Sequence, residues 1–493
     1  MAAPVAVRVG VAEVHVVEQV EGVDAKDERC LLGDSGGFLK RHIGVGEAGT
    51  GEGVALQVAK AGGLSIEGPG SNSAPRGEVT SNIPEDMLRS QAFGLTVVAL
   101  GVLVLMPAVA HALPETVDTN PLNRQPEVQE AFQQFYNMNY EDALPRFEKI
   151  QREHPGDAIA TVYVLDAVLF RELNRLDLLD TTFYANDGFL TGKHTVVEDP
   201  KVRDRIRVLG DETVNEANAA LKKNPNDENA LFARGFAKSL EATYSAMVER
   251  AFPTGLKQAL GARNDCDRVL QLDPNYADAE LVTGVYQYVV GALPMAFKVL
   301  IGFMGIHGSK GAGMALLRDD GERGVITRVE ARTSMTLFLR REGKYEAAVK
   351  IAQGLAEEYP HDYLFWLEQG NLEKDAGDGM AAVETYERLI EMAKRPGYFP
   401  NAHLELAYFG LGDSLRGQKK FGEAVAAYRE GADQATTSEE LKRRCLLEAG
   451  KTYDLMREHD KAVEQYEAVL NAGSDTVQGD QARRYMKSAY VGK

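Results

Sequence analysis

The chain carries one short pattern several times. Clear copies read GKYEAAVKIAQGLAEEYP at 343–360, FGEAVAAYREG at 421–431 and HDKAVEQYEAVL at 459–470. A further copy stands at 139–155 and a looser one at 380–390. A repeated helix pair cannot bury its apolar face alone, so it must stack on its neighbours. The repetition therefore predicts an all-α chain of stacked helical hairpins.

Each copy is built on an alanine, with a large or small apolar residue four positions later. The alanines are Ala143, Ala348, Ala382, Ala424 and Ala462, and the residues four positions later are Phe147, Ala352, Tyr386, Tyr428 and Tyr466. Steps of three and four place such residues on one helical face. In three copies a glycine stands twelve residues before the alanine, namely Gly370, Gly412 and Gly450. We expect each glycine on the preceding helix, where a side chain would push the two helices apart while the aromatic residue fills the adjoining gap.

The pattern resembles the tetratricopeptide repeat (TPR), a helix–turn–helix unit of 34 residues, which is also the distance from Thr336 to Gly370. Four consecutive copies between residues 329 and 476 match it, as does one near 124–157. The resemblance implies a TPR-type α-solenoid whose first helices line a concave groove. We expect the C-terminal TPR array to occupy 326–493.

Residues 113–325 predict a less regular TPR-like helical region. Segments 221–235 and 269–284 look like TPR joints, and an over-long helix is expected over 228–250. The block 284–324 resembles the inclusion-body clearance family of TPR proteins. The matching residues are Leu293, Pro294, Gly302, Phe303, Met304, Gly305 and the run Gly313 to Leu317. This second resemblance implies no catalytic residue.

The N-terminus has the layout of an exported protein. Residues 87–112 hold Arg89, then the uncharged apolar run 92–110, then Ala110-His111-Ala112, as in a secretory signal peptide cleaved near Ala112. Residues 1–86, rich in glycine, are then a mis-called upstream extension or a disordered leader. The alternative is a membrane anchor formed by 92–110. We expect a mature chain from Leu113 in a bacterial periplasm.

Charge and composition exclude several classes of function. The net charge of −18 argues against nucleic-acid binding. Cys266 falls on the apolar face of its helix and is expected to be a small core residue. The scattered histidines show no ligand spacing, so neither a metal nor another cofactor is expected. The glycine-rich run 305–313 predicts a turn between two helices, with an anion at the following helix start as the alternative.

The TPR resemblance implies which side chains face the groove. One row holds Arg340, Lys374 and Arg416 and is interrupted by Asp454. The neighbouring row holds Leu337, Asn371, Asp413 and Lys451. Three cations in a line could take an acidic or extended peptide, and Asn371 could bond its backbone. The alternative is that these are solvated surface charges.

These features predict a non-catalytic protein-interaction scaffold or adaptor of the cell envelope, which docks a peptide or helix of a protein partner in the groove. The alternative from a different class is a lipid- or glycan-binding envelope protein that uses the apolar segment 289–305. Membrane association is possible but not favoured, because this segment lacks a basic polar face. An enzyme is the third class, and no constellation of residues supports it.

Overall fold

The computed structural model describes residues 118–184, 196–293, 298, 302 and 306–492. The predicted leader and signal peptide therefore lie outside the described residues, as do Pro294 and Phe303–Gly305 of the central block. All described residues belong to one compact unit, and their contacts cross the expected boundary at 325 and 326.

The described residues form seventeen α-helices and two short 3-10 helices, without a strand. The helices before the C-terminal array are η1 (Pro121–Arg124), α1 (Pro126–Tyr136), α2 (Tyr140–Glu153), α3 (Ala158–Arg175), η2 (Thr181–Tyr184), α5 (Pro200–Lys223), α6 (Glu228–Met247), α7 (Phe252–Leu272), α8 (Ala279–Ala292) and α10 (Lys310–Arg323). The array itself comprises α11 (Arg328–Arg341), α12 (Tyr345–Glu358), α13 (Tyr363–Asp375), α14 (Gly379–Ala393), α15 (Leu404–Gly417), α16 (Phe421–Asp433), α17 (Glu439–Leu455), α18 (His459–Ala472) and α19 (Val477–Lys487). The all-α prediction is confirmed for these residues.

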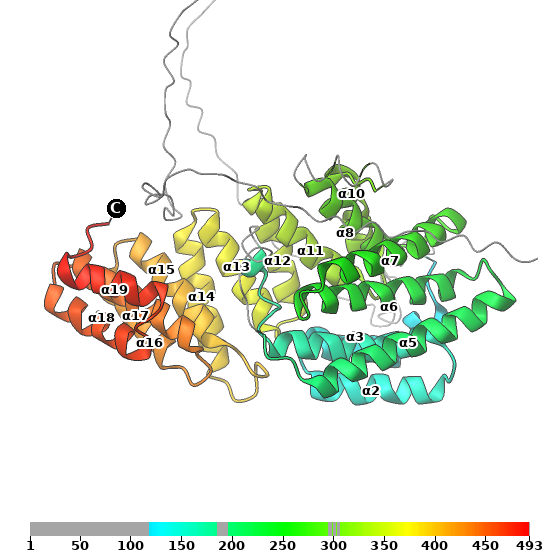
Figure 1. Cartoon of the computed structure of the whole chain (residues 1–493), viewed down its shortest axis with the longest axis horizontal. Helices are drawn as coiled ribbons and strands as arrows, with labels where there is room; N and C mark the ends of the chain where they lie inside the picture. The colour runs from blue at the N-terminus through cyan, green and yellow to red at the C-terminus, as the bar shows by residue number, and fades with distance from the viewer. Residues whose placement is uncertain (1–117, 185–195, 294–297, 299–301, 303–305, 493) are drawn as a thin grey trace, which may run out of the picture. The chain divides into compact units, whose positions relative to one another are not determined.

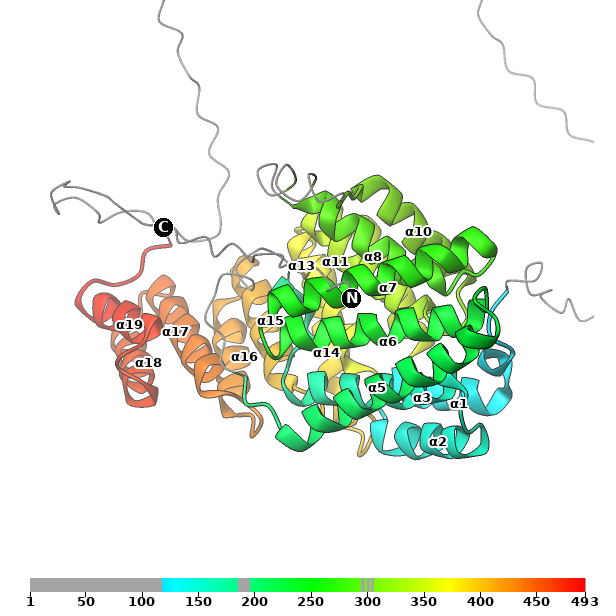
Figure 2. The same cartoon turned by 45° about the vertical axis from the view of Figure 1, so that its right-hand side comes forward.

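Consecutive helices pair as antiparallel hairpins, and each hairpin packs on the next. The pairs include α1 with α2, α6 with α7, α11 with α12, and α17 with α18. Their colours run from cyan at α2 to red at α19, so the order of hairpins can be followed in two views (Figure 1, Figure 2). This is the stacked-hairpin architecture that the repeats predict.

Local chemistry sets where the helices begin and turn. Asp227 and Asp362 cap their helices by accepting hydrogen bonds from backbone N–H groups of the first turn. The tight turns after α11 and α13 contain Gly343 and Gly377, each with positive φ. The equivalent turn after α15 uses Lys419, which adopts the left-handed conformation without being glycine.

The glycine-to-aromatic joint predicted for the repeats is confirmed. A Cβ atom added to Gly370 would lie 2.8 Å from the ring of Tyr386, and one on Gly412 would lie 2.6 Å from the ring of Tyr428. The same substitution at Gly450 would meet Tyr466 at 2.5 Å. All three tyrosines and the repeat alanines beside them are fully buried. Glycine is therefore what permits each helix pair to close over its tyrosine.

The same joint also occurs in the region expected to be irregular. Gly235 lies against the sulfur of Cys266, where a Cβ atom would approach to 2.8 Å. Cys266 is fully buried, and burial raises the pKa of its thiol, in keeping with the expected core role. The over-long helix is α6, which ends at Met247 rather than at residue 250.

The glycines at the start of α10 serve a close helix contact. A Cβ atom on Gly308 would lie 2.7 Å from the carbonyl oxygen of Gln287, and one on Gly313 would lie 2.6 Å from that of Gly284. Ser309 caps the helix itself, since its Oγ accepts from Ala312 N at 3.3 Å. These glycines thus bring α10 against α8, a role beyond the predicted turn.

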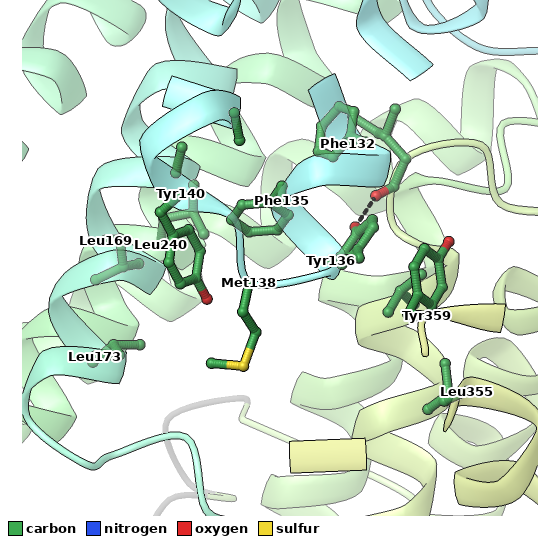
Figure 3. Close-up of a cluster of buried hydrophobic side chains, with 14 of the residues drawn as sticks. Phe132, Phe135, Tyr136, Met138, Tyr140, Leu169, Leu173, Leu240, Leu355 and Tyr359 are labelled. Carbon is green, nitrogen blue, oxygen red and sulfur yellow. Dashed lines mark hydrogen bonds between the residues drawn. The ribbon is translucent and has the colours of Figure 1, made fainter. Parts of the chain in front are cut away.

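The first hairpin, α1 with α2, also packs against the fifth, α11 with α12. This contact closes the N-terminal hairpins around an interior. The Tyr136 hydroxyl of α1 lies 2.7 Å from the carbonyl oxygen of Ile326, and its ring lies 5.3 Å from that of Tyr359. Figure 3 shows Tyr136 beside Tyr359, with Phe135 and Met138 in the same buried cluster.

The carboxylate of Asp278, at the start of α8, fastens this closure. It accepts from Thr119 Oγ1 at 2.6 Å, from Val325 N at 2.7 Å and from Ile326 N at 3.0 Å. Asp278 is fully buried, so its charge is stabilised by these donors rather than by water. One side chain thereby joins the segment before α1, the start of α8 and the segment before α11.

Candidate functional site

The predicted row of cations exists, with one cation on each of three successive first helices. Arg340 lies on α11, Lys374 on α13 and Arg416 on α15. Each is paired with a carboxylate of the next hairpin: Arg340 with Glu368 and Asp375, Lys374 with Asp413, and Arg416 with Glu448. The row is therefore a ladder of alternating charges rather than a line of three free cations.

Arg340 is not available to a partner in this structure, which corrects its assignment to an open groove. Only 4% of the residue is exposed. Its Nη1 lies 2.9 Å from Glu368 Oε2 and donates to Thr181 Oγ1 at 3.1 Å. Thr181 belongs to η2, so the chain's own segment covers α11 and α13 here.

The other end of the ladder is covered by the C-terminal segment. Lys451 on α17 pairs with Glu448 at 2.9 Å and lies 5.5 Å from the ring centre of Tyr490. Tyr490 N donates to Asp454 Oδ2 at 2.8 Å. Lys451 is buried as a result, so its predicted place in an open groove is also corrected.

Two predicted residues of the neighbouring row hold the repeat tyrosines. The Tyr386 hydroxyl donates to Asn371 Oδ1 at 2.7 Å, and the Tyr428 hydroxyl donates to Asp413 Oδ1 at 2.7 Å. Asn371 is buried. These contacts use the Asn371 carbonyl oxygen for packing within a hairpin.

The middle of the ladder stays accessible. The side chains of Lys374, Asp413 and Arg416 are 29%, 25% and 26% exposed. Lys374 Nζ lies 3.7 Å from Asp413 Oδ2, which is longer than a hydrogen bond. The structure thus brings together these three of the six predicted residues as a partly exposed site.

Charge pairing dominates the electrostatics at the C-terminal side of this site. Burial of Glu448 raises its pKa, but Arg416 and Lys451 outweigh that effect, so the pKa lies below its usual value. Although burial opposes the charge of Arg416, Tyr428, Glu448 and Asp413 keep its pKa raised. Both charges therefore persist at neutral pH.

A second candidate site, which the sequence reasoning missed, is a pair of adjoining cavities inside the closed hairpins. The smaller has a volume of about 190 Å³ and the larger about 510 Å³. Phe170, Glu330 and Ser334 line both. The larger volume falls within the roughly 300–1,000 Å³ typical of ligand pockets.

The two cavities differ in chemistry. The larger is lined mainly by apolar side chains of α6, α7 and α8, and three of them, Phe252, Leu256 and Val289, are 39%, 45% and 47% exposed. The smaller adds carboxyl groups to aromatic walls. Its described acidic lining residues are Asp180, Glu330, Asp362 and Glu368.

The buried carboxyl groups have unusual affinities for protons. Burial raises the pKa of Glu330, of Asp362 and of Glu368 to about 7 each. Asp166, one helical turn before Phe170, is also fully buried, and neither of its carboxylate oxygens has a hydrogen-bond partner in the described structure. Burial and the nearby Glu330 raise its pKa well above the usual value. A sequence signal was present, because Asp166 interrupts the apolar run of α3.

The described residues include neither a metal-binding cluster nor a membrane-spanning helix. No group of three or more His, Cys, Asp and Glu side chains there could hold a metal ion. No helix in the described ranges is both long enough and apolar enough to cross a membrane.

Comparison with known proteins gives only distant likenesses. No family model and no curated protein matches the chain. Among solved structures, the APC/C hetero-tetramer Cut9–Hcn1 matches with a TM-score of 0.39 and 13% identity over 74% of this chain and 57% of that one. Yeast Tom70 matches with a TM-score of 0.29 and 11% identity, covering 73% of this chain and 87% of that chain. A tetratricopeptide repeat protein from Parabacteroides merdae has a TM-score of 0.27 and 14% identity, covering 63% of this chain and 99% of that chain.

At such TM-scores the likenesses carry no argument. The assignment of TPR-type hairpins rests on the repeat spacing of this chain and on its glycine-to-tyrosine joints.

Proposed function

We propose that this protein is a non-catalytic scaffold that holds a segment of a partner protein against the exposed middle of the charge ladder, at Lys374, Asp413 and Arg416. The observation that carries the proposal is the loose Lys374–Asp413 pair, 3.7 Å apart and partly exposed. The lysine ammonium has three donors, and this distance leaves them free to bind an incoming carboxylate or backbone carbonyl. An extended acidic peptide fits this chemistry.

The flanking contacts define the length of the proposed site. Thr181 covers the ladder at Arg340, and Tyr490 covers it at Lys451. A partner segment would therefore lie across α13 and α15, between Arg340 on α11 and Lys451 on α17. The proposed site is shorter than the groove expected from the sequence.

The proposed location is the cell envelope. The support is the signal-peptide layout of residues 87–112, with cleavage near Ala112. N-terminal sequencing of the protein from the envelope fraction tests this point. A chain that begins near Leu113 supports export, whereas a chain that retains residues 92–110 supports the membrane anchor.

The scaffold role is tested by a matched pair of charge reversals. Lys374→Glu places a carboxylate opposite Asp413, while Lys350→Glu makes the same change at an exposed position on the second helix α12. We expect envelope proteins captured by the wild type to be lost with Lys374→Glu and retained with Lys350→Glu. Identical capture by all three proteins would overturn the proposed site.

One observation favours a second function from another class, the binding of a small apolar ligand. Val289 and Val290, at the start of the apolar segment 289–305, line the larger cavity. The described part of that segment therefore contributes to a pocket wall.

A further inference from the structure

The joined cavities have the layout of a binding site for a two-part molecule. The larger cavity is apolar and opens where Phe252, Leu256 and Val289 are partly exposed. The smaller cavity adjoins the larger one. Glu330 lies where the two cavities meet, because it lines both. Glu330 retains accessible surface although it lies deep in the hairpin stack, and that surface faces the cavities.

The charge of the lining selects the head of such a molecule. Four described lining residues of the smaller cavity are acidic, and no described residue lining either cavity is Lys, Arg or His. Arg340 lies just outside and pairs with Glu368. Glu330 has no described cationic partner, and its carboxylate accepts from the Tyr136 hydroxyl.

The surroundings of Asp166 independently favour a cationic head group. It is fully buried, has no hydrogen-bond donor among the described residues and interacts with Glu330. Buried carboxyl groups without donors are costly, so they are commonly paired in proteins. A cation held at Glu330 would lower the cost of both groups.

The aromatic residues of the smaller cavity suit the same head group. Phe135, Tyr136, Tyr140 and Phe170 line its walls. Aromatic faces attract ammonium groups, and more strongly where water is excluded. A carboxylate or phosphate head would instead meet like charge.

We infer that the cavities bind an apolar molecule that carries a protonated amine, with the amine at Glu330 and the apolar body in the larger cavity. The inference deepens the small-ligand function proposed above and does not use Lys374, Asp413 or Arg416, because none of these lines either cavity. The nearest part of the ladder is Arg340, through Glu368.

The test compares three probes that share one tail. Binding of decylamine, decanol and decanoate to the full chain is measured by calorimetry at about pH 8, where Glu330 is ionised, below the micelle concentrations of the two ions and the solubility limit of decanol. We expect decylamine to bind most tightly, decanol at least about tenfold more weakly, and decanoate not at all. Equal affinity for the three probes, or no binding of decylamine, would overturn the inference.

Three variants assign the site. Glu330→Gln removes the charge with little change of shape and should weaken decylamine about tenfold while leaving decanol nearly unchanged. Ala259→Phe places a ring in the larger cavity, which Ala259 lines, and should weaken both probes. The matched control, Glu322→Gln, alters an exposed carboxyl group of α10 and should change neither. Decylamine binding that survives both Glu330→Gln and Ala259→Phe would place the ligand elsewhere and contradict the inference.

Discussion

The hydroxyl oxygen of Tyr136 lies 2.7 and 2.6 Å from the two carboxylate oxygens of Glu330, across 194 positions of sequence. This contact joins α1 to α11, the first hairpin to the fifth. It also holds the one carboxyl group among the described residues that lines both interior cavities. Closure of the hairpins and the chemistry of the cavity are thus linked through a single pair of side chains.

Removing the hydroxyl should weaken this closure. Tyr136→Phe leaves Glu330 and the Ile326 carbonyl without their donor, at an expected cost of about 1–3 kcal/mol in the free energy of unfolding. Urea unfolding of Tyr136→Phe, Glu330→Gln and the double variant checks it. The two effects should not add, because the residues share one hydrogen bond. Additive effects would show that they act separately.

Asp278 should contribute more to the stability of this closure than the Tyr136–Glu330 contact does. Asp278→Ala removes the acceptor for Ile326 N and Thr327 N, which are then buried without a partner, and we expect a loss of about 3 kcal/mol or more. Amide hydrogen exchange at residues 325–327 should accelerate in step. Asp480→Ala is the control, since its surface pair with Arg483 contributes about 0.5 kcal/mol. Similar losses for the two variants would refute the fastening role.

The buried acids should make stability depend on pH in an unusual direction. The folded-state pKa of Glu330 is raised to about 7 from 4.5, so between these values the folded chain holds a proton that the unfolded chain has released. Stability from this group is therefore full below about pH 4.5 and is lost as the pH rises through 7, by about 1.4 kcal/mol for each pH unit that separates the folded and unfolded pKa values.

Comparison with Glu330→Gln isolates this contribution from the other titrating groups. The free energy of unfolding of Glu330→Gln, minus that of the wild type, should therefore rise from about pH 5 to about pH 8. Denaturant midpoints at the two pH values measure the gain. A difference between the proteins that does not change with pH would mean that Glu330 titrates normally.

The glycine-to-tyrosine joint predicts opposite effects for two glycines in neighbouring helices. Gly412→Ala would place a methyl group 2.6 Å from the buried ring of Tyr428 and should destabilise the chain by about 1–3 kcal/mol. Gly422, in the first turn of α16, has no neighbouring atom within 4 Å of such a methyl group. Gly422→Ala should therefore be neutral or stabilising by up to about 1 kcal/mol. Thermal unfolding of the two variants decides between these outcomes.

The hairpins could be predicted because their determinants are local. Gly412 and Tyr428 stand at a fixed spacing in successive copies, and close helix packing requires a small residue opposite a large one. The core role of Cys266 followed from the same reasoning. Because the pattern repeats, the fold could be predicted without knowledge of contacts between residues that are distant in the sequence.

The sequence could not show which residues of the predicted groove are covered, because segments distant in the sequence determine this. Thr181 reaches Arg340 across 159 positions, and no repeat pattern encodes that contact. The smaller cavity has the same origin, since side chains of α1, α3 and α11 line it together. Spacing placed Lys374 and Arg416 on successive helices, but it could not show that carboxylates of the next hairpins pair with them.

The central claim is that a partner segment lies against the middle of the charge ladder, and site-specific photo-crosslinking tests it most directly. A photoreactive residue is placed at Lys374 in one protein and at Lys350 in another, and both are irradiated in intact cells. The account predicts one discrete cross-linked partner protein at position 374 and none at position 350. Absence of any adduct at 374, or the same adducts at both positions, would contradict it.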